Sequence, residues 1–227
     1  MDLDNYTGVY REYHDEEKTR IKSEVFLNNG VREGEYKCYH EKGNIFYINN
    51  YVNGKRHGEY KEYHDNENLY EISNYVNDMI HGEYKSYCNN GKLRTKYNYV
   101  DGQIHGEFYD LYHDGKIRIF CNYINGKVKG EYREYWIHGN LRKITNYDIN
   151  EQLNGELRSY YYNGQLEIIH NYVNGLIHGE YKSYYENGQL HSICNYVNGK
   201  IHGEYKKYYE NGQLWEICNY VNGQKIE

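Results

Sequence analysis

The 227-residue sequence contains no proline and no alanine, and none of its five cysteines belongs to a Cys-x-x-Cys pair. It has no apolar run long enough to span a bilayer as a helix, and residues 1–4 lack the pattern of a signal peptide. GxSxG, Walker and GxGxxG motifs are also missing. These absences predict a soluble intracellular protein, located in the cytoplasm, without the enzyme classes that depend on those motifs.

Charge and composition further restrict the functional classes to which the protein can belong. The formal net charge is -6 and the pI is ≈ 6.1, which argues against a role built on nucleic-acid phosphates and does not favour an anionic membrane. The mean hydropathy is only -1.09, yet the chain contains 33 tyrosines. Because tyrosine supplies apolar area together with a polar hydroxyl, this composition is compatible with a folded core.

The sequence repeats itself with a period of about 24 residues. A Gly-Glu-Tyr marker or a close variant begins each repeat, which we call a copy. The copies begin at Gly8, Gly34, Gly58, Gly82, Gly106, Gly130, Gly155, Gly179 and Gly203. The repeats predict one array over residues 8–227, preceded by a polar leader of residues 1–7 that we expect to be frayed.

Each copy contains two strand-like runs separated by turn signals. In the eighth copy the runs are GEYKSYY and LHSICNYV, and Asn187-Gly188 and Asn198-Gly199 follow them. Asn-Gly is typical of a two-residue type I′ hairpin turn, so we predict a tight turn at both places, with Asn187-Gly188 in a type I′ or related turn with positive φ. The first turn would pair Tyr185 with Leu190, and the second would pair Cys194 with Gly203.

These two turns assign the side chains to the same two faces. We call one the core face, because it gathers most of the apolar side chains: Tyr181, Tyr185, Leu190, Cys194, Tyr196 and Ile201. We call the other the amphipathic face: Glu180, Lys182, Tyr184, His191, Ile193, Asn195, Val197 and His202. A copy cannot fold alone, so neighbouring copies must stack.

The predicted fold is therefore all-β. We expect a repetitive antiparallel β-hairpin array, an extended, twisted or curled meander of about nine copies and up to about 18 strands, ending on the second strand of the ninth copy. The core face would be covered either by curling or by a partner chain. Glu67 and Asp78 replace turn glycines, and one extra residue near Glu151 predicts a bulge or a longer loop.

Two sets of side chains are weighed as metal or redox sites and rejected. The histidines that precede the marker (His57, His81, His105, His178 and His202) would lie about 10 Å apart, too far for one metal ion to bridge two copies. Cys121, Cys194 and Cys218 occupy equivalent places and are separated by the same distance, so free thiols are expected. We predict no catalytic residues, no cofactor and no metal.

The candidate interaction surface is a row of tyrosines on the amphipathic face, one in most copies. This tyrosine ladder comprises Tyr39, Tyr63, Tyr87, Tyr135, Tyr160, Tyr184 and Tyr208. Exposed aromatic side chains are enriched at protein interfaces, whereas cross-strand packing within the sheet would explain them without a partner. Either role is compatible with the pattern.

Tyr-Glu-Asn-Gly-Gln-Leu followed by Tyr-Val-Asn-Gly-Lys-Ile-His-Gly-Glu-Tyr resembles the MORN repeat variant. It occurs in bacterial YwqK-like proteins described as antitoxins and in repeat proteins of large DNA viruses of amoebae. The resemblance covers about residues 8–223 and departs from the pattern at Lys129 and Asn154. It implies a non-catalytic scaffold that binds a protein partner of unknown identity, with self-association also open. The alternatives are a peripheral membrane protein and an antitoxin-like inhibitor of a partner protein.

Overall fold

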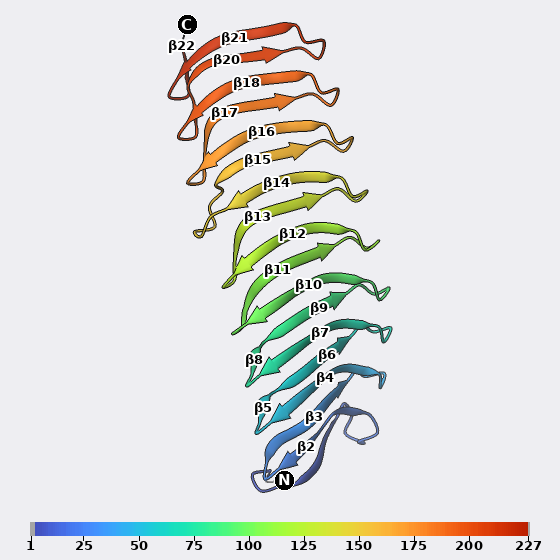
Figure 1. Cartoon of the computed structure of the whole chain (residues 1–227). Helices are drawn as coiled ribbons and strands as arrows, with labels where there is room; N and C mark the ends of the chain where they lie inside the picture. Colours follow the sequence, from blue (N-terminus) through green and yellow to red (C-terminus); the bar gives the residue numbers. More distant parts are fainter. Residues whose placement is uncertain (1–2, 227) are drawn as a thin grey trace. The chain divides into compact units, whose positions relative to one another are not determined.

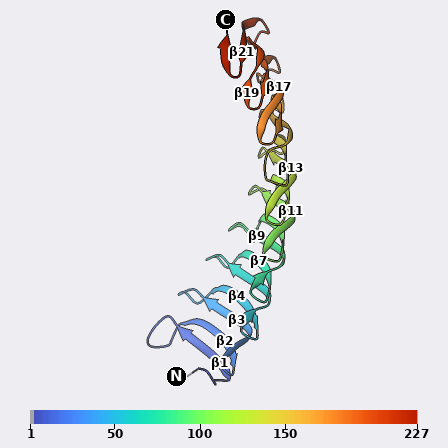
Figure 2. The same ribbon diagram turned by 90° about the vertical axis from the view of Figure 1, so that its left-hand side faces the viewer.

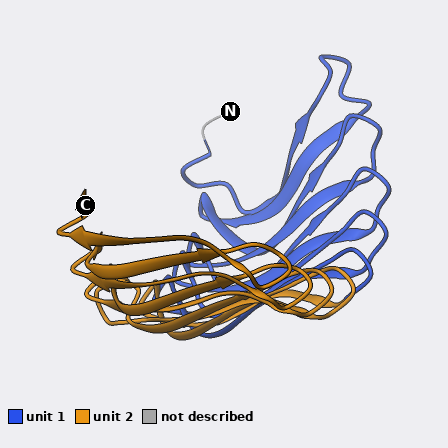
Figure 3. Ribbon diagram, turned by 90° about the horizontal axis from the view of Figure 1, so that it is seen from above, with its two compact units in different colours: residues 1–115 blue, residues 116–227 orange. Residues whose placement is uncertain are grey.

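The computed structural model describes residues 3–226, which form strands and turns with no helix among them. The chain divides into two compact units, Met1–Gly115 and Lys116–Glu227 (Figure 3). Within each unit the strands follow one another in chain order, each antiparallel to the next (Figure 1). The all-β hairpin array predicted from the repeats is thus confirmed.

The strands of the first unit run from the first copy into the fifth. They are β1 (Gly8–Tyr13), β2 (Ile21–Asn28), β3 (Val31–Tyr39), β4 (Ile45–Val52), β5 (Lys55–Arg56), β6 (Gly58–Tyr63), β7 (Leu69–Val76), β8 (Met79–Ile80), β9 (Gly82–Tyr87), β10 (Leu93–Val100) and β11 (Gln103–Leu111).

The strands of the second unit continue the same pattern to the ninth copy. They are β12 (Ile117–Ile124), β13 (Lys127–Tyr135), β14 (Leu141–Tyr147), β15 (Gly155–Tyr160), β16 (Leu166–Val173), β17 (Leu176–Tyr184), β18 (Leu190–Val197), β19 (Lys200–Ile201), β20 (Gly203–Tyr208), β21 (Leu214–Val221) and β22 (Gln224–Ile226).

Two expectations about the strands need correction. The 22 strands of the described chain exceed about 18, because several copies have a short strand such as β19 between the second turn and the next marker. The last strand is not the second one of the ninth copy, since β22 follows the final turn and pairs with β21 through Val221 and Gln224.

The second turn of a copy is the type I′ turn that was predicted. In the eighth copy Asn198 has φ 49° and Gly199 has φ 78°, and Tyr196 pairs with Ile201. The Gly199 amide also donates to the carbonyl of Ile177 in the preceding copy (2.9 Å). The asparagine and the glycine thus relieve backbone strain, and the turn backbone ties each copy to its neighbour.

The first turn is not a type I′ turn but a related one that keeps the predicted positive φ at its glycine, and the two-residue pairing expected from a type I′ turn is wrong. At Asn187-Gly188 only the glycine has a positive φ (82°), and its amide donates to the Tyr185 carbonyl. The Asn187 side-chain oxygen accepts from the Gln189 amide instead (2.9 Å). Leu190 consequently pairs with Tyr184, not with Tyr185.

This irregularity also changes the assignment of His191. Its Nδ1 lies 3.1 Å from Ser183 Oγ, and its ring packs edge-on against Tyr185, so His191 contacts residues of the core face. The expected pairing of Cys194 with Gly203 is also wrong. Gly203 has φ 87° and lies at an irregularity after β19, beyond which the pairing continues with Ile193 opposite Lys206.

The departures from the repeat are accommodated locally. Glu67 (φ 66°) and Asp78 (φ 68°) adopt the left-handed conformation that glycine has in other copies, and their amides keep the turn hydrogen bonds. The extra residue of the sixth copy lengthens its second turn, as expected, and the Asp148 amide donates to the Gln152 carbonyl across the loop (2.9 Å).

The leader is ordered where the structure describes it, contrary to the expectation of fraying. The Gly30 amide donates to the Tyr6 carbonyl (2.9 Å), and the Asn29 amide donates to Thr7 Oγ1 (3.0 Å). The part of that expectation that concerns residues 1 and 2 lies outside the described residues. Residues 3–7 therefore belong to the folded first unit.

The core sits on the core face. Every described residue that is nearly inaccessible to solvent lies there: Ser23, Val25, Leu27, Asn49, Ser73, Ser86, Asp110, Cys121, Thr145, Leu157, His170, Ser183, Ser192 and Cys194. Half of them occupy one equivalent place near the middle of the second long strand, which we call the central row: Val25, Asn49, Ser73, Tyr97, Cys121, Thr145, His170, Cys194 and Cys218.

Tyrosine rings flank this row in a repeated geometry. Tyr181 lies opposite Cys194 in the register, and its ring contacts Tyr196 with centroids 5.7 Å apart. The equivalent pairs are Tyr36–Tyr51, Tyr60–Tyr75, Tyr84–Tyr99, Tyr132–Tyr147 and Tyr205–Tyr220, with centroids 6.0–6.1 Å apart. Large rings beside a small central residue thus form the core of a thin sheet.

The cysteines are free thiols, as expected from their spacing. Cys121 and Cys194 are buried, and burial raises the pKa of each thiol to about 11. These two side chains therefore serve as small apolar residues of the central row and are not reactive thiolates near neutral pH.

Candidate interaction surface

The amphipathic face carries a charge pair in nearly every copy. The acidic residue of the marker bonds the basic residue two positions later, as in Glu180–Lys182 (2.6 Å) and Glu131–Arg133 (2.7 Å). The same pair occurs as Glu35–Lys37, Glu59–Lys61, Glu83–Lys85, Glu156–Arg158 and Glu204–Lys206. Ion pairs this exposed contribute little to stability, so these charges are available to a partner.

The tyrosine ladder lies beside these pairs, two residues after each basic residue. All seven predicted tyrosines are partly exposed and none is buried. Because side chains alternate along a strand, Tyr63 shares a face with Lys61 and Glu59, whereas Tyr60 points to the other face and bonds Glu62 (2.6 Å). The ladder therefore lies on the amphipathic face, beside the charge pairs.

Tyr39 differs from the other ladder residues in its environment. Its hydroxyl donates to Glu24 Oε1 (2.9 Å), and partial burial followed by this bond raises the pKa of Tyr39 to about 12. The same hydrogen bond lowers the pKa of Glu24. Tyr39 is thus engaged within the first unit, whereas Tyr63 and Tyr87 are the better probes of the ladder there.

A second row supports the ladder and was missed in the sequence. The residue after each ladder position lies at the first turn, and in several copies its polar atom bonds the ladder backbone of the next copy. Tyr161 and Tyr185 hydroxyls donate to the carbonyls of Tyr184 and Tyr208 (both 2.8 Å), and Trp136 Nε1 donates to that of Tyr160 (3.2 Å). In the first unit His64 Nε2 lies 3.0 Å from the Tyr87 carbonyl.

This turn row fixes the ladder backbone while the ladder rings remain on the amphipathic face. The signal was visible as His, Tyr or Trp recurring at one place of the copy, but the side-chain type varies. Because only the hydrogen-bonding atom is shared, sequence identity does not reveal the equivalence.

Apolar side chains line the margin of the same face, at the second turns. Val52, Val76, Val100, Ile124, Val173, Val197 and Val221 are 39–47% exposed. A hollow of about 460 Å³ also opens between the first two copies, lined by Val9, Phe26, Arg11, Lys37, Glu33 and Glu35 among others. Together these features make the amphipathic face a mixture of aromatic, aliphatic and paired charged groups.

Nothing in the described part of the chain gathers metal ligands. Residues 3–226 contain no group of three or more His, Cys, Asp or Glu side chains placed to hold an ion. The histidines before the markers contribute backbone hydrogen bonds between neighbouring strands. The amides of His57, His81 and His202 donate to the carbonyls of Asn50, Asn74 and Asn195, respectively.

A family model described as the MORN repeat variant matches six stretches: residues 32–53, 56–77, 80–101, 153–174, 177–198 and 201–222. The matches cover more than half of the chain. The chain belongs to the MORN repeat variant family. MORN repeats are generally protein-interaction or membrane-interaction repeats, and the family is not enzymatic.

The unmatched stretch between residues 102 and 152 includes Lys129 and the lengthened turn of the sixth copy. Its strands nevertheless keep the register of the other copies, with Tyr132 opposite Thr145 as Tyr181 is opposite Cys194. The MORN architecture therefore persists where the sequence diverges.

No curated protein matches this chain. Among solved structures, it is similar to one titled as a GtfA/B complex bound to UDP and GlcNAc, with 18% identity, a TM-score of 0.21, and coverage of 51% of this chain and 22% of that one. It also resembles chains in a TcdB2-TccC3-Cdc42 structure (12% identity, TM-score 0.23) and a Photorhabdus luminescens Tc holotoxin pore (12%, 0.22). Each of these two similarities covers 93% of this chain but only 13% and 15% of the other.

No helix among the residues that the structure describes is long and apolar enough to cross a membrane.

Proposed function

We propose that this chain is a non-catalytic MORN scaffold that binds a protein partner along its amphipathic face. The observation that carries the proposal is the repetition on that face of one partly exposed tyrosine beside one charge pair, in copy after copy. Such a surface offers many equivalent weak contacts, which suits an extended partner and does not suit catalysis, because a general acid or base needs one unusual environment.

The difference in burial between the core face and the amphipathic face supports the same proposal. The core face holds the buried residues, and burial raises the pKa values of Tyr60 and Tyr84 strongly. The ladder tyrosines lie on the opposite face and do not cover the central row, so their partly exposed rings can contribute to contact with another molecule. Tyrosine suits this purpose because it provides a large contact area with few rotatable bonds.

A membrane role is the weaker alternative. Anionic lipid attracts unpaired basic clusters, whereas here the lysines and arginines of the markers are paired with glutamates and the net charge is -6. An antitoxin-like role would be a special case of protein binding, and no contact in the structure favours it.

The proposal is tested by affinity capture from the native cell with paired double variants. Tyr63→Ser with Tyr87→Ser should reduce recovery of a specific partner while the β-sheet circular dichroism is kept. Tyr60→Ser with Tyr84→Ser is the matched control, since the same residue type is removed from the core face of the same strands. We expect it to lower the melting temperature first, because these two half-buried rings flank the central row; truncation of a fully buried aromatic costs ~3–5 kcal/mol, so each change should cost less than that.

Two results would contradict this function. One is a stability loss in the Tyr63 and Tyr87 pair that the Tyr60 and Tyr84 pair does not show, since the faces would then be inverted. The other is binding of the parent chain to anionic vesicles that weakens with salt and survives both double variants, which would favour the membrane role.

A further inference from the structure

The leader imitates part of a copy that would precede the first one. In the interior of the array, the glycine amide of most second turns donates to a carbonyl of the copy before it, as Gly199 does to Ile177 (2.9 Å) and Gly223 to Ile201 (2.8 Å). The first copy has the same turn glycine, Gly30, and its amide donates to Tyr6 of the leader (2.9 Å). Tyr6 thus stands where the short strand before a marker stands elsewhere.

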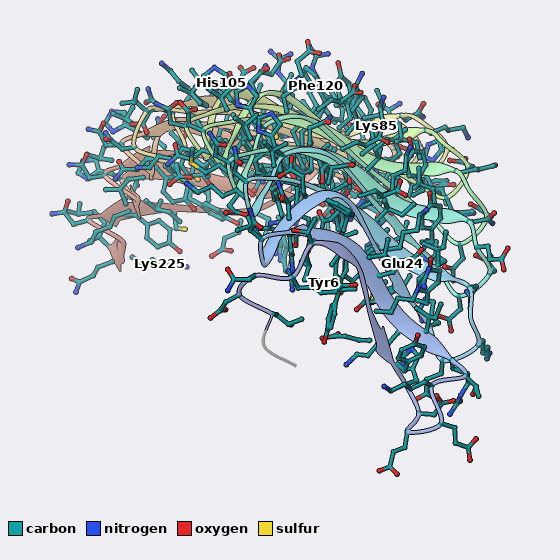
Figure 4. All side chains as sticks on the ribbon, turned by 90° about the horizontal axis from the view of Figure 1, so that it is seen from below. Tyr6, Glu24, Lys85, His105, Phe120 and Lys225 are labelled. Atoms are coloured by element: carbon teal, nitrogen blue, oxygen red, sulfur yellow. The ribbon has the colours of Figure 1, made fainter. Side chains whose placement is uncertain are left out.

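Further contacts hold the leader in this place. Thr7 Oγ1 accepts from the Asn29 amide, and Tyr6 Oη donates to the Val9 carbonyl (3.0 Å). A Cβ at Gly30 would lie 2.6 Å from the Leu3 carbonyl oxygen, so the leader backbone passes directly over the turn. Tyr6 carries a label in Figure 4, close to the blue strands of the first copies.

Beside the leader, β1 presents the outer edge of a standard marker strand. Its sequence, GVYREY, aligns with GEYKSY of β17, and both pair inward in the same register: Tyr10 with Val25, and Tyr181 with Cys194. Within the described chain β1 has a partner strand on its β2 side only. The outer edge of β1 is therefore equivalent to the edge of β20 that pairs with β18, for example through Lys206 and Ile193.

The ninth copy carries the complementary surface. Tyr209, Leu214, Trp215 and Ile217 are 47–52% exposed, whereas their equivalents in the eighth copy, among them Tyr185 and Ile193, are less exposed because the ninth copy packs beside them. On the side away from β20, β21 has a partner within the described chain only at Asn219, Tyr220 and Val221, which pair with β22.

We propose that the ninth copy of one chain stacks on the first copy of a second chain, and that residues 3–7 oppose this contact. By analogy with the interior junctions, Ile217 would lie opposite Arg11, and the Tyr209 hydroxyl would donate to the Tyr13 carbonyl. The Gly30 amide would then bond β22 of the other chain in place of Tyr6. The leader and β22 compete for one place, so the leader acts as an intramolecular cap.

Charge adds a second barrier to this head-to-tail contact. In the same register Glu216 would lie opposite Glu12. At the equivalent place of the interior junction, Ser192 of β18 lies opposite Lys207 of β20. Lys225 bonds Glu216 (2.8 Å) and offsets part of the repulsion. Because a heterologous contact uses a different surface on each of the two molecules, an uncapped chain would form head-to-tail oligomers and not a symmetric dimer.

The test measures the molar mass by light scattering during size exclusion at several protein concentrations, with circular dichroism as the folding control. We expect deletion of residues 1–7 to raise the association constant at least about tenfold over the full chain. Adding Glu12→Ser to the deletion should strengthen association further, and adding Ile217→Lys should abolish it. Val221→Lys is the matched control, since Val221 is exposed in the same strand but already pairs with Gln224.

The idea is overturned if the folded deletion variant associates no more than the full chain, or if Ile217→Lys and Val221→Lys act alike. If the deletion variant does not fold, Thr7→Ala in the full chain replaces it, because this change removes the bond to the Asn29 amide and leaves the strands intact. Increased association of a folded Thr7→Ala chain supports the cap, and unchanged association rejects it.

Discussion

At the residue scale, the chain builds its core from tyrosine rings and small partners. The rings flank a central residue that differs in nearly every copy, for example Ser73, Thr145 and Cys194. The hydroxyl groups of Ser73 and Thr145 have no hydrogen-bond partner in the structure, although both are fully buried. Polarity therefore does not decide which residue occupies this place, and small size is not required either, since Tyr97 and His170 belong to the same row.

His170 is the histidine of this row, and it makes stability depend on pH. It is 6% exposed, stacks on Tyr181 and contacts Tyr172 edge-on, and burial followed by the nearby charge of Lys143 lowers its pKa. A histidine with a lowered pKa in the folded state stays neutral while the unfolded chain takes up a proton. Stability should therefore be lost as the pH falls below the ordinary value of 6.5.

The measurement compares melting temperatures of the parent and of His170→Thr, which installs the residue of the sixth copy, between about pH 7 and about pH 5. The variant should gain relative stability toward acid, because carboxylates elsewhere affect both proteins alike. A difference in melting temperature that stays constant with pH would show that His170 does not titrate on unfolding.

At the element scale, the two turns of a copy differ in backbone conformation and in hydrogen bonding. The second turn needs positive φ at two residues and gives its glycine amide to the neighbouring copy. The first turn needs positive φ at one residue only, and it shifts the register so that His191 joins the core face. The same Asn-Gly dipeptide therefore specifies two conformations, and the surrounding hydrogen bonds decide between them.

Gly188→Val tests the first turn. Gly188 has φ 82°, and a new Cβ would approach Gln165 Oε1 at 3.2 Å, which a flexible side chain can relieve. The backbone strain cannot be relieved, so we expect a loss of ~1 kcal/mol or more in the free energy of unfolding. Glu67→Gly is the opposite control, because Glu67 already holds this conformation (φ 66°) and should gain stability. Unchanged denaturation midpoints for both variants would contradict the strain argument.

At the scale of the whole molecule, stability comes from junctions between like copies. Neighbouring hairpins exchange the same backbone pairs, turn bonds and turn-row bonds throughout each unit (Figure 2). Arrays of this kind behave as sums of repeat and junction terms.

Deleting the 24 residues Gly179–His202 should therefore leave a folded array, because the seventh and ninth copies would meet through equivalent residues. Deleting only 12 residues of this copy should unfold the second unit, since it removes one strand and reverses the direction of every later strand. Circular dichroism melts distinguish the two deletions. Equal loss of structure in both would rule out the additive model.

The sequence alone determined the all-β repeat array, the family, the strands of each copy and the separation of Tyr60 from Tyr63 onto opposite faces. These follow from local chemistry, since a period of two and the Asn-Gly signals act within a few residues. The tertiary structure decided what depends on the neighbouring copy. The pairing of Leu190 with Tyr184, the turn-row bonds to ladder carbonyls and the docking of the leader on Gly30 are examples. Each is set by a hydrogen-bond partner that lies outside the local sequence, where a pattern within one copy carries no information about it.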